Sequence, residues 1–375
     1  MKRGWGGLLG LLAASLSLLP ASAVRAQALA QPPGLIRAIM SVTVAPNGKP
    51  IALDALLTRP AAPGRYPLVV LSHGAPRDTA ELLTTEPTAY SAVAIAFARR
   101  GYAVIVPLRR GYGRSGGPYA EGVGPCNSPP YQAAARASGR DVAETVAFMA
   151  HQDYVDPTRV ILAGVSAGGF ASVAAAAQHP PGVVAVLNFA GGRGSEAPDT
   201  VCGEDKLLQT YAELGREIRV PTLWLYAKND HYFGALARRF FAAFTKAGGT
   251  GEFVALPAFG DDGHYQFTTD GMAVWRDPVD AFLRAHQLPT WAKPMAEPVP
   301  SVPPPHALSA SGRQDFESYL AYSNFEKAFA VGSRGQHSWR TGLRSPEEAA
   351  RAALDACRKN GPGCEVYAIN NALAR

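Results

Sequence analysis

The stretch GVSAG at residues 164–168 decides the fold of this chain. It follows the apolar run RVILA at 159–163 and precedes the alanine-rich stretch 170–178. This succession predicts a strand, an abrupt glycine-flanked turn and a helix, with Ser166 at the apex of the turn. The free N–H groups at the start of such a helix, and the positive end of its dipole, point at any oxyanion formed beside the serine. The five-residue pattern alone is equally typical of a structural turn, so its context must decide.

Apolar runs and helix-forming stretches alternate on both sides of this turn. Strands are expected at 38–44 and 51–53, joined by an Asn-Gly turn, and then at 66–72, 102–106, 159–165, 183–189, 222–226 and 252–256. Helices are expected up to residue 100, at 133–152, after the serine, at 234–246 and at 272–287. Strands that alternate with long helices predict an α/β fold with a doubly wound, mostly parallel sheet. The functional site of such a sheet lies beyond the carboxyl ends of its strands.

Two further residues near strand ends have side chains that could act together with the serine in catalysis. A serine hydroxyl is a poor nucleophile until a base takes its proton, and the base needs a carboxylate to fix its tautomer. Asp230 ends the predicted strand that begins near 222, and His264 lies in the loop GDDGH at 260–264 after another strand. The order Ser166, Asp230, His264 therefore predicts a nucleophile, an orienting acid and a base.

These residues, together with other short motifs, make the sequence resemble a known family. From about residue 35 to 288 it resembles the α/β-hydrolases, and among them the dienelactone hydrolase-like and acyl-peptidase-like esterases. The resemblance rests on SHG at 72–74, GVSAG at 164–168, NDHYF at 229–233 and GHY at 263–265.

The resemblance implies an α/β-hydrolase fold and a set of roles. Ser166 is the implied nucleophile, His264 the base and Asp230 its orienter, and the backbone N–H groups of Ala75 and Ala167 form the implied oxyanion hole. Dienelactone hydrolases carry a cysteine nucleophile, whereas this chain has a serine. Their particular substrate is therefore not implied.

Other residues compete for these roles. Asp261 and Asp262 are alternatives to Asp230, although their closeness in sequence to His264 makes the far ring nitrogen hard to reach. His73 is expected to shape the oxyanion loop rather than to act as the base.

The glycine-rich loop RRGYGRSGG at 109–117 has two interpretations. It is either a structural turn or the place where one of its arginines faces the pocket and binds a substrate carboxylate. It lacks the strand-helix context of a dinucleotide site. We expect no cofactor.

The N-terminus predicts an exported protein. A basic start at Lys2 and Arg3, an apolar segment at 4–19 and small residues after it are typical of a signal peptide, with cleavage after residue 23 or 26. The apolar segment is too short for a comfortable membrane span. We therefore expect a periplasmic or extracellular protein with a signal peptide at 1–26 and no membrane span.

The net charge limits the partners that the protein can be expected to bind, and the cysteines predict disulfides. The net charge of +6 falls to +3 when the three basic residues of the leader are removed, too little to indicate nucleic acid or an anionic membrane as a partner. Four cysteines in an exported chain favour disulfides. We pair Cys357 with Cys364 across a short glycine- and proline-containing loop, and Cys126 with Cys202 by elimination. Metal binding is the alternative, but the spacing of a metal site is absent, so no metal is expected.

The remaining sequence predicts a second unit. A hydrolase domain at 35–290 is followed by a proline-rich linker at 291–308 and a small disulfide-containing module at 309–375. In the module, Ser345 followed by proline and glutamates predicts a helix start, and 365–369 a strand. Its Trp, Gly, Ser, Ala, Leu, Cys, Cys pattern resembles a module of exported bacterial proteins. It either binds a partner or cell-envelope component, or docks as a stabilising α+β appendage.

Together these observations predict a secreted serine hydrolase that cleaves a carboxylic ester through an acyl-enzyme. A peptidase or amidase uses the same triad and is the first alternative, and a non-catalytic binding protein is the second. The substrate is expected to be a small-molecule ester or a peptide. Irregular segments at 126–132 and 192–213 are expected to cover the site.

Overall fold

The computed structural model describes residues 31–234, 236–268, 270–288, 294–296 and 299–374, together with residues 1 and 29. The predicted signal peptide, apart from residue 1, lies outside the described residues. Within the described part of the chain, no helix has both the length and the apolar character needed to cross a bilayer.

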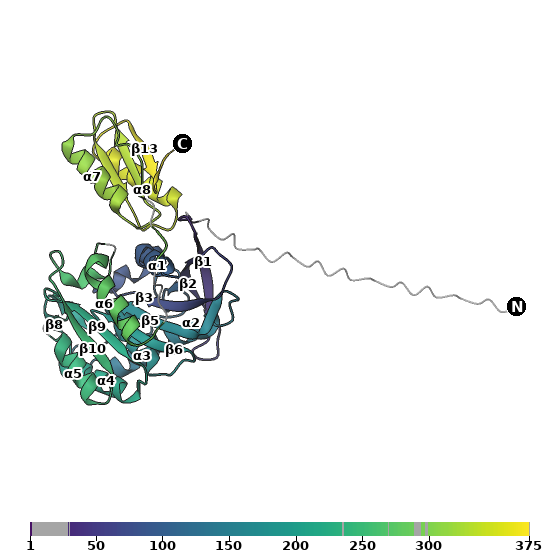
Figure 1. Ribbon diagram of the computed structural model, residues 1–375, viewed down its shortest axis with the longest axis vertical. Coiled ribbons are helices and arrows are strands. Elements are labelled where there is room, and N and C mark those ends of the chain that lie inside the picture. Colours follow the sequence, from purple (N-terminus) through teal and green to yellow (C-terminus); the bar gives the residue numbers. More distant parts are fainter. Residues whose placement is uncertain are drawn as a thin grey trace.

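An eight-stranded sheet forms the centre of the larger part of the molecule (Figure 1). Its strand order is β1-β2-β4-β3-β5-β6-β9-β10. β2 pairs antiparallel with β1 and with β4, and all other neighbours are parallel. The strands are β1 Leu35–Val44, β2 Ile51–Pro60, β3 Tyr66–Ser72, β4 Ala103–Pro107, β5 Val155–Val165, β6 Val183–Phe189, β9 Thr222–Ala227 and β10 Gly251–Leu256. The predicted α/β class with a mostly parallel sheet is confirmed.

Helices cover both faces of this sheet, which explains why its central strands read as continuous apolar runs. In β3, Leu68 and Val70 join the core beneath α2, α3, α4 and α5, whereas Val69 and Leu71 join the core beneath α1 and α6. The helices are α1 Ser91–Ala98, α2 Tyr131–Met149, α3 Ala167–Ala176, α4 Glu204–Glu217, α5 Ala237–Lys246 and α6 Met272–Ala285. Short 3-10 turns are η1 Thr79–Thr84, η2 Pro87–Tyr90 and η3 Gly263–Gln266.

One segment differs from its prediction. The stretch 192–213 is irregular only at its start; β7 Ser195–Ala197 and β8 Thr200–Val201 form a hairpin, and α4 begins at Glu204. The helix forms because Leu207 and Tyr211, four residues apart, both enter the core, while acidic residues occupy its first turn. The prediction of an irregular cover is therefore wrong from Glu204 onward.

The C-terminal part folds around a second sheet of order β12-β11-β13-β14, all antiparallel. The Ser345 hydroxyl accepts a hydrogen bond from the Glu348 N–H at 3.2 Å, so the predicted helix start is present. The predicted Cys357–Cys364 disulfide joins the end of α8 to β13. Its elements are α7 Ala310–Ala321, β11 Ala328–Gly332, β12 His337–Arg340, α8 Pro346–Lys359, β13 Cys364–Ile369 and β14 Ala372–Leu373.

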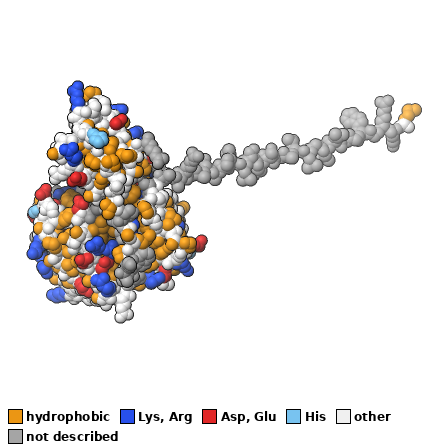
Figure 2. Space-filling view, turned by 45° about the horizontal axis from the view of Figure 1, so that its top comes forward, with side chains coloured by type: hydrophobic (Ala, Val, Ile, Leu, Met, Phe, Trp, Pro, Cys, Tyr) orange, Lys and Arg blue, Asp and Glu red, His pale blue; other side chains and the backbone are white. Residues whose placement is uncertain are grey.

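We call residues 310–374 the C-terminal module. It forms a smaller lobe next to α1 and β1 (Figure 1). On the face shown in Figure 2, Lys and Arg side chains are interspersed with Asp and Glu rather than gathered in one patch.

Candidate active site

Ser166 stands on the sharp turn between β5 and α3. Its backbone has φ 56° and ψ −124°, in a region that side-chain-bearing residues rarely adopt. Glycines make the close approach possible, because a Cβ at Gly164 would lie 2.3 Å from the Gly168 carbonyl oxygen, and one at Gly168 would lie 2.0 Å from that of Ser72. The sequence thus builds a strained turn that presents the Ser166 side chain at the carboxyl end of the sheet.

His264 and Asp230 meet at the same edge of the sheet. His264 lies in η3, after β10, and Asp230 lies just after β9. The His264 Nδ1 atom is 3.2 Å from Asp230 Oδ1 and 3.3 Å from Oδ2. The Asp230 side chain is fully buried, and Oδ1 also accepts hydrogen bonds from the N–H groups of Tyr232 and Phe233. This pairing leaves Nε2 as the ring nitrogen available to another group.

Aromatic rings hold the His264 imidazole in place. The Tyr232 ring stacks on it with centroids 3.8 Å apart and planes 12° from parallel, and the Phe233 ring packs at 5.6 Å. The Arg77 guanidinium in turn lies 3.6 Å from the centroid of the Tyr232 ring. The roles of Tyr232 and Arg77 leave no signal in the sequence, because no local pattern marks a ring that stacks on a histidine 32 positions away.

The competing acid Asp262 has a different place. Its Oδ1 accepts hydrogen bonds from the backbone N–H groups of His264, at 2.9 Å, and His231, at 3.1 Å. Asp262 therefore caps η3. Asp230, and not Asp262, faces the imidazole Nδ1.

The loop after β3 is fixed by buried polar contacts. The Gly74 N–H donates to the Tyr90 hydroxyl at 3.0 Å, and Ala75, the next residue along the loop, borders the cavity. Burial, aided by the charge of Arg109, lowers the pKa of His73 to about 3. A neutral His73 accepts from the Arg109 N–H at its Nε2, which gives it a structural place beside this loop.

Arg109 is buried and does not face the pocket. Its Nε donates to Glu121 at 2.8 Å, and its Nη1 to the His73 carbonyl at 2.8 Å. Arg193, from the loop after β6, donates to the other Glu121 oxygen at 2.8 Å. Burial opposes the charge of Glu121, but Arg109 and Arg193 outweigh it and lower its pKa to about 2. Of the two interpretations, the structural one describes Arg109.

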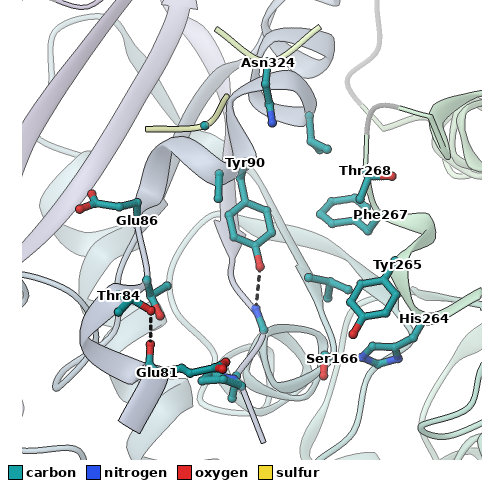
Figure 3. A pocket seen from close by; sticks show the side chains of 18 of the residues that line it. Glu81, Thr84, Glu86, Tyr90, Ser166, His264, Tyr265, Phe267, Thr268 and Asn324 are labelled. Atoms are coloured by element: carbon teal, nitrogen blue, oxygen red, sulfur yellow. Dashed lines mark hydrogen bonds between the residues drawn. The ribbon is translucent and has the colours of Figure 1, made fainter. Parts of the chain in front are cut away.

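Ser166 borders two cavities of unequal size. The larger, of about 750 Å³, is also lined by His264, and Figure 3 shows the two side chains beside each other at its floor. The smaller, of about 260 Å³, is lined by Ala167 and by residues 192–195. We call them the large and the small cavity. Ala75 borders both. The structure thus brings together all five residues that the sequence singles out.

The Cys126–Cys202 disulfide joins the two segments that border the small cavity. Among the described residues, Cys126, Cys202 and Glu196 form the one cluster close enough to hold a metal ion. Both sulfurs are committed to the disulfide, so this cluster does not fit a metal.

One family of known proteins matches part of the chain. The sequence model of the X-Pro dipeptidyl-peptidase (S15) family matches residues 48–197, a region that holds Ala75 and Ser166 but ends before Asp230 and His264. No curated protein matches the chain.

Several solved structures are similar to the larger part of the molecule. An esterase from Pyrococcus furiosus is 12% identical with a TM-score of 0.47, and covers 66% of this chain and 90% of its own. An acylaminoacyl peptidase from Pyrococcus horikoshii is 14% identical with a TM-score of 0.46, covering 70% of this chain and 43% of its own. A dienelactone hydrolase-like phosphotriesterase from metagenomic libraries is 14% identical with a TM-score of 0.42, covering 60% and 82%.

Proposed function

We propose that this chain is a serine hydrolase of the α/β-hydrolase superfamily that cleaves a carboxylic ester through an acyl-enzyme intermediate. Ser166 is the nucleophile, His264 the general base and acid, and Asp230 the orienter of the imidazole. The observation that carries these roles is the buried Asp230 carboxylate against His264 Nδ1, at 3.2 Å, in a site where Ser166 and His264 border one cavity.

The first half of the reaction forms the acyl-enzyme. His264 Nε2 takes the proton of the Ser166 hydroxyl as its oxygen attacks the ester carbonyl carbon. The negative charge that develops on the carbonyl oxygen is stabilised by the N–H groups of Ala75 and Ala167. Collapse of the tetrahedral intermediate breaks the bond to the alcohol oxygen, which leaves with the proton from Nε2.

The second half repeats these steps with water. His264 takes a proton from the water that attacks the acyl-enzyme, and returns it to the Ser166 oxygen as the acid leaves. Asp230 remains ionised throughout and stabilises the imidazolium that forms twice per turnover. We also propose that the protein acts outside the cytoplasm, which the N-terminal sequence supports.

The alternative is a peptidase with the same triad. The match to a dipeptidyl-peptidase family favours it, and so do Asp78 and Glu81, two exposed acidic residues on the large cavity that suit a substrate ammonium group. The ester remains the first choice because the C-terminal module also borders this cavity, through Tyr322 and Leu343, which suits a small molecule better than a long polypeptide.

A panel of substrates separates the two. We expect the purified protein to hydrolyse p-nitrophenyl esters at least about 100-fold faster, in kcat/KM, than aminoacyl-p-nitroanilides with comparable groups. A fluorophosphonate probe should label the wild type and fail to label Ser166→Ala, whose thermal unfolding should match the wild type. Ser172→Ala, in the same helix, is the control and should be labelled fully. Faster cleavage of the anilides would favour the peptidase, and full labelling of Ser166→Ala would refute the assignment of the nucleophile.

A further inference from the structure

We infer that the large cavity holds the alcohol part of the substrate, that the small cavity holds its acyl part, and that the C-terminal module forms the far wall of the alcohol site. The preferred substrates are then esters of a short acid with a bulky, mainly uncharged alcohol. This inference rests on the proposed ester hydrolysis and adds to it the substrate class.

The position of the general acid assigns the two cavities. The imidazole must deliver its proton to the departing alcohol oxygen, so this oxygen must lie on the His264 side of Ser166. His264 borders the large cavity, and the residues that line the small cavity do not include it. The alcohol therefore extends into the large cavity, and the acyl group lies on the opposite side of the nucleophile.

The small cavity suits a short acyl group. Its volume is about 260 Å³, against about 750 Å³ for the large one. Its walls are crowded, since a Cβ at Gly192 would lie 2.8 Å from the Phe233 ring, and one at Gly194 would lie 1.9 Å from the Tyr131 hydroxyl. The Cys126–Cys202 disulfide ties the bordering segments together, so the space cannot easily widen.

The large cavity suits a bulky and mainly uncharged group. Val93, Phe267 and Leu343 give it apolar surface. Glu86 also borders it, but Arg344 lies 3.0 Å and Arg114 3.9 Å from Glu86, and these two cations together balance the carboxylates of Glu86 and Asp54. The exposed side chains of Asp78 and Arg77, of opposite charge, lie on the loop that follows β3, and the exposed Glu81 of η1 adds one carboxylate to the lining.

The wall opposite this loop belongs to the C-terminal module. Tyr322, Asn324, Gly342 and Leu343 border the same cavity as Ser166, although they follow it by more than 150 positions in sequence. Figure 3 shows Asn324 at the far end of the cavity from Ser166 and His264. A long alcohol therefore reaches the module before it reaches solvent.

Hydrogen bonds and ion pairs fix this wall in place. Asn324 Oδ1 accepts from the Ala92 N–H at the start of α1, at 2.7 Å. The Thr88 hydroxyl donates to the Gly342 carbonyl at 3.0 Å. Both contacts are made by residues of the wall itself, so its distance from Ser166 is set by the fold of the larger part.

Arg344 holds the wall from behind. Its guanidinium forms a two-pronged pair with Asp54 of β2, at 2.6 and 2.9 Å. The hydrogen bonds to Asp54 raise the pKa of Arg344, so the cation persists at every pH at which the protein is folded. The module therefore acts as a permanent part of the alcohol site and sets its depth.

Two ester series, measured by titration of the released acid, test the assignment on the full-length protein. One keeps acetate constant and varies the alcohol from methyl to butyl, cyclohexyl and benzyl. The other keeps methanol constant and varies the acid from acetate to octanoate. We expect kcat/KM to rise about 10-fold or more along the first series, since each buried methylene contributes several-fold, and to fall about 10-fold along the second. The opposite trends would overturn the assignment of the two cavities.

Variants of the module's wall residues test whether the preference for a large alcohol depends on this wall. Leu343→Trp should lower the ratio of kcat/KM for benzyl acetate to kcat/KM for methyl acetate by about 10-fold. Leu343→Ala should raise the ratio of benzyl to methyl acetate, and it carries the test if the tryptophan variant does not fold. Leu373→Trp changes an exposed residue of β14 and is the matched control. It should leave the ratio of benzyl to methyl acetate unchanged.

The outcomes also separate this inference from the proposed function. Loss of selectivity along the acid series in Leu343→Trp, with the alcohol series unchanged, would overturn the inference while ester hydrolysis stands. Absence of hydrolysis of every ester, together with absence of fluorophosphonate labelling, would instead refute the proposed function.

Discussion

Replacement of Glu326 by glutamine should loosen the C-terminal module. Glu326 and Arg37 of β1 form a two-pronged ion pair with both hydrogen bonds at 2.9 Å, and both side chains are fully buried. Removal of one partner from a buried pair costs about 3–5 kcal/mol, because the other charge stays buried. Glutamine keeps one acceptor oxygen in place, so we expect a loss near the lower end, about 3 kcal/mol. That is roughly a 100-fold change in the equilibrium between docked and undocked module.

Urea unfolding followed by circular dichroism and by limited proteolysis measures this change. Glu326→Gln should shift the first transition to lower urea and speed cleavage near the linker. Glu317→Gln, an exposed position of α7, is the matched control and should leave both unchanged. The double variant Arg37→Gln/Glu326→Gln should recover part of the loss, since two amides hydrogen-bond without a buried charge. A loss under about 1 kcal/mol in the single variant would refute the view that this pair fixes the module.

Two further predictions concern the catalytic histidine and the buried histidine. Asp230→Asn should favour the wrong imidazole tautomer and lower kcat by about 10⁴-fold, whereas the capping change Asp262→Asn should cost less than about 10-fold; a reversed ranking would move the acid role to Asp262. The pKa of His73 is about 3 in the folded protein and near 6.5 in an unfolded chain, so between these values only the unfolded state binds the proton. Stability is therefore fully present above about pH 6.5 and falls by about 1.4 kcal/mol per pH unit as the pH drops toward 3. The free energy of unfolding, measured by urea titration from pH 6.5 to 4, should depend less steeply on pH in His73→Asn than in the wild type, by the contribution of one proton. Equal pH dependence in the two proteins would contradict a neutral buried His73.

The sheet and the reacting residues are predictable from sequence because each leaves a local signal. A strand buried on both faces requires a continuous apolar run, as in Tyr66–Ser72. The turn at Ser166 requires glycines two positions away on either side, and these appear in the sequence. The start of the helix at Pro346 is predictable because Ser345 before it is a typical N-cap residue. These signals depend on neighbours within a few positions, and the chain alone carries them.

Long-range contacts leave no such signal. Tyr90 looks like any residue of a helical stretch, yet its hydroxyl binds the Gly74 N–H in the oxyanion loop. A proline-rich composition indicates a linker, but it does not disclose that the module beyond it borders the cavity of Ser166. The acid role had three candidates in sequence, and only the folded positions of Asp230 and Asp262 show that one contacts the ring and the other caps η3.

A buried network of charged side chains lies near Ser166, and its contribution to the stability of the fold does not by itself explain its presence. Glu121 joins Arg109, after β4, to Arg193, after β6, and Arg109 reaches back to the His73 carbonyl after β3. A well-packed apolar cluster would stabilise these loops as well, because burial of three charges carries a large desolvation penalty. Ion pairs, unlike apolar contacts, fix direction as well as distance, and Arg109 also hydrogen-bonds the His73 carbonyl in the loop after β3. The low pKa of Glu121, about 2, keeps its carboxylate ionised at neutral pH. In the proposed mechanism, these contacts hold the loops on the acyl side in place before the substrate arrives.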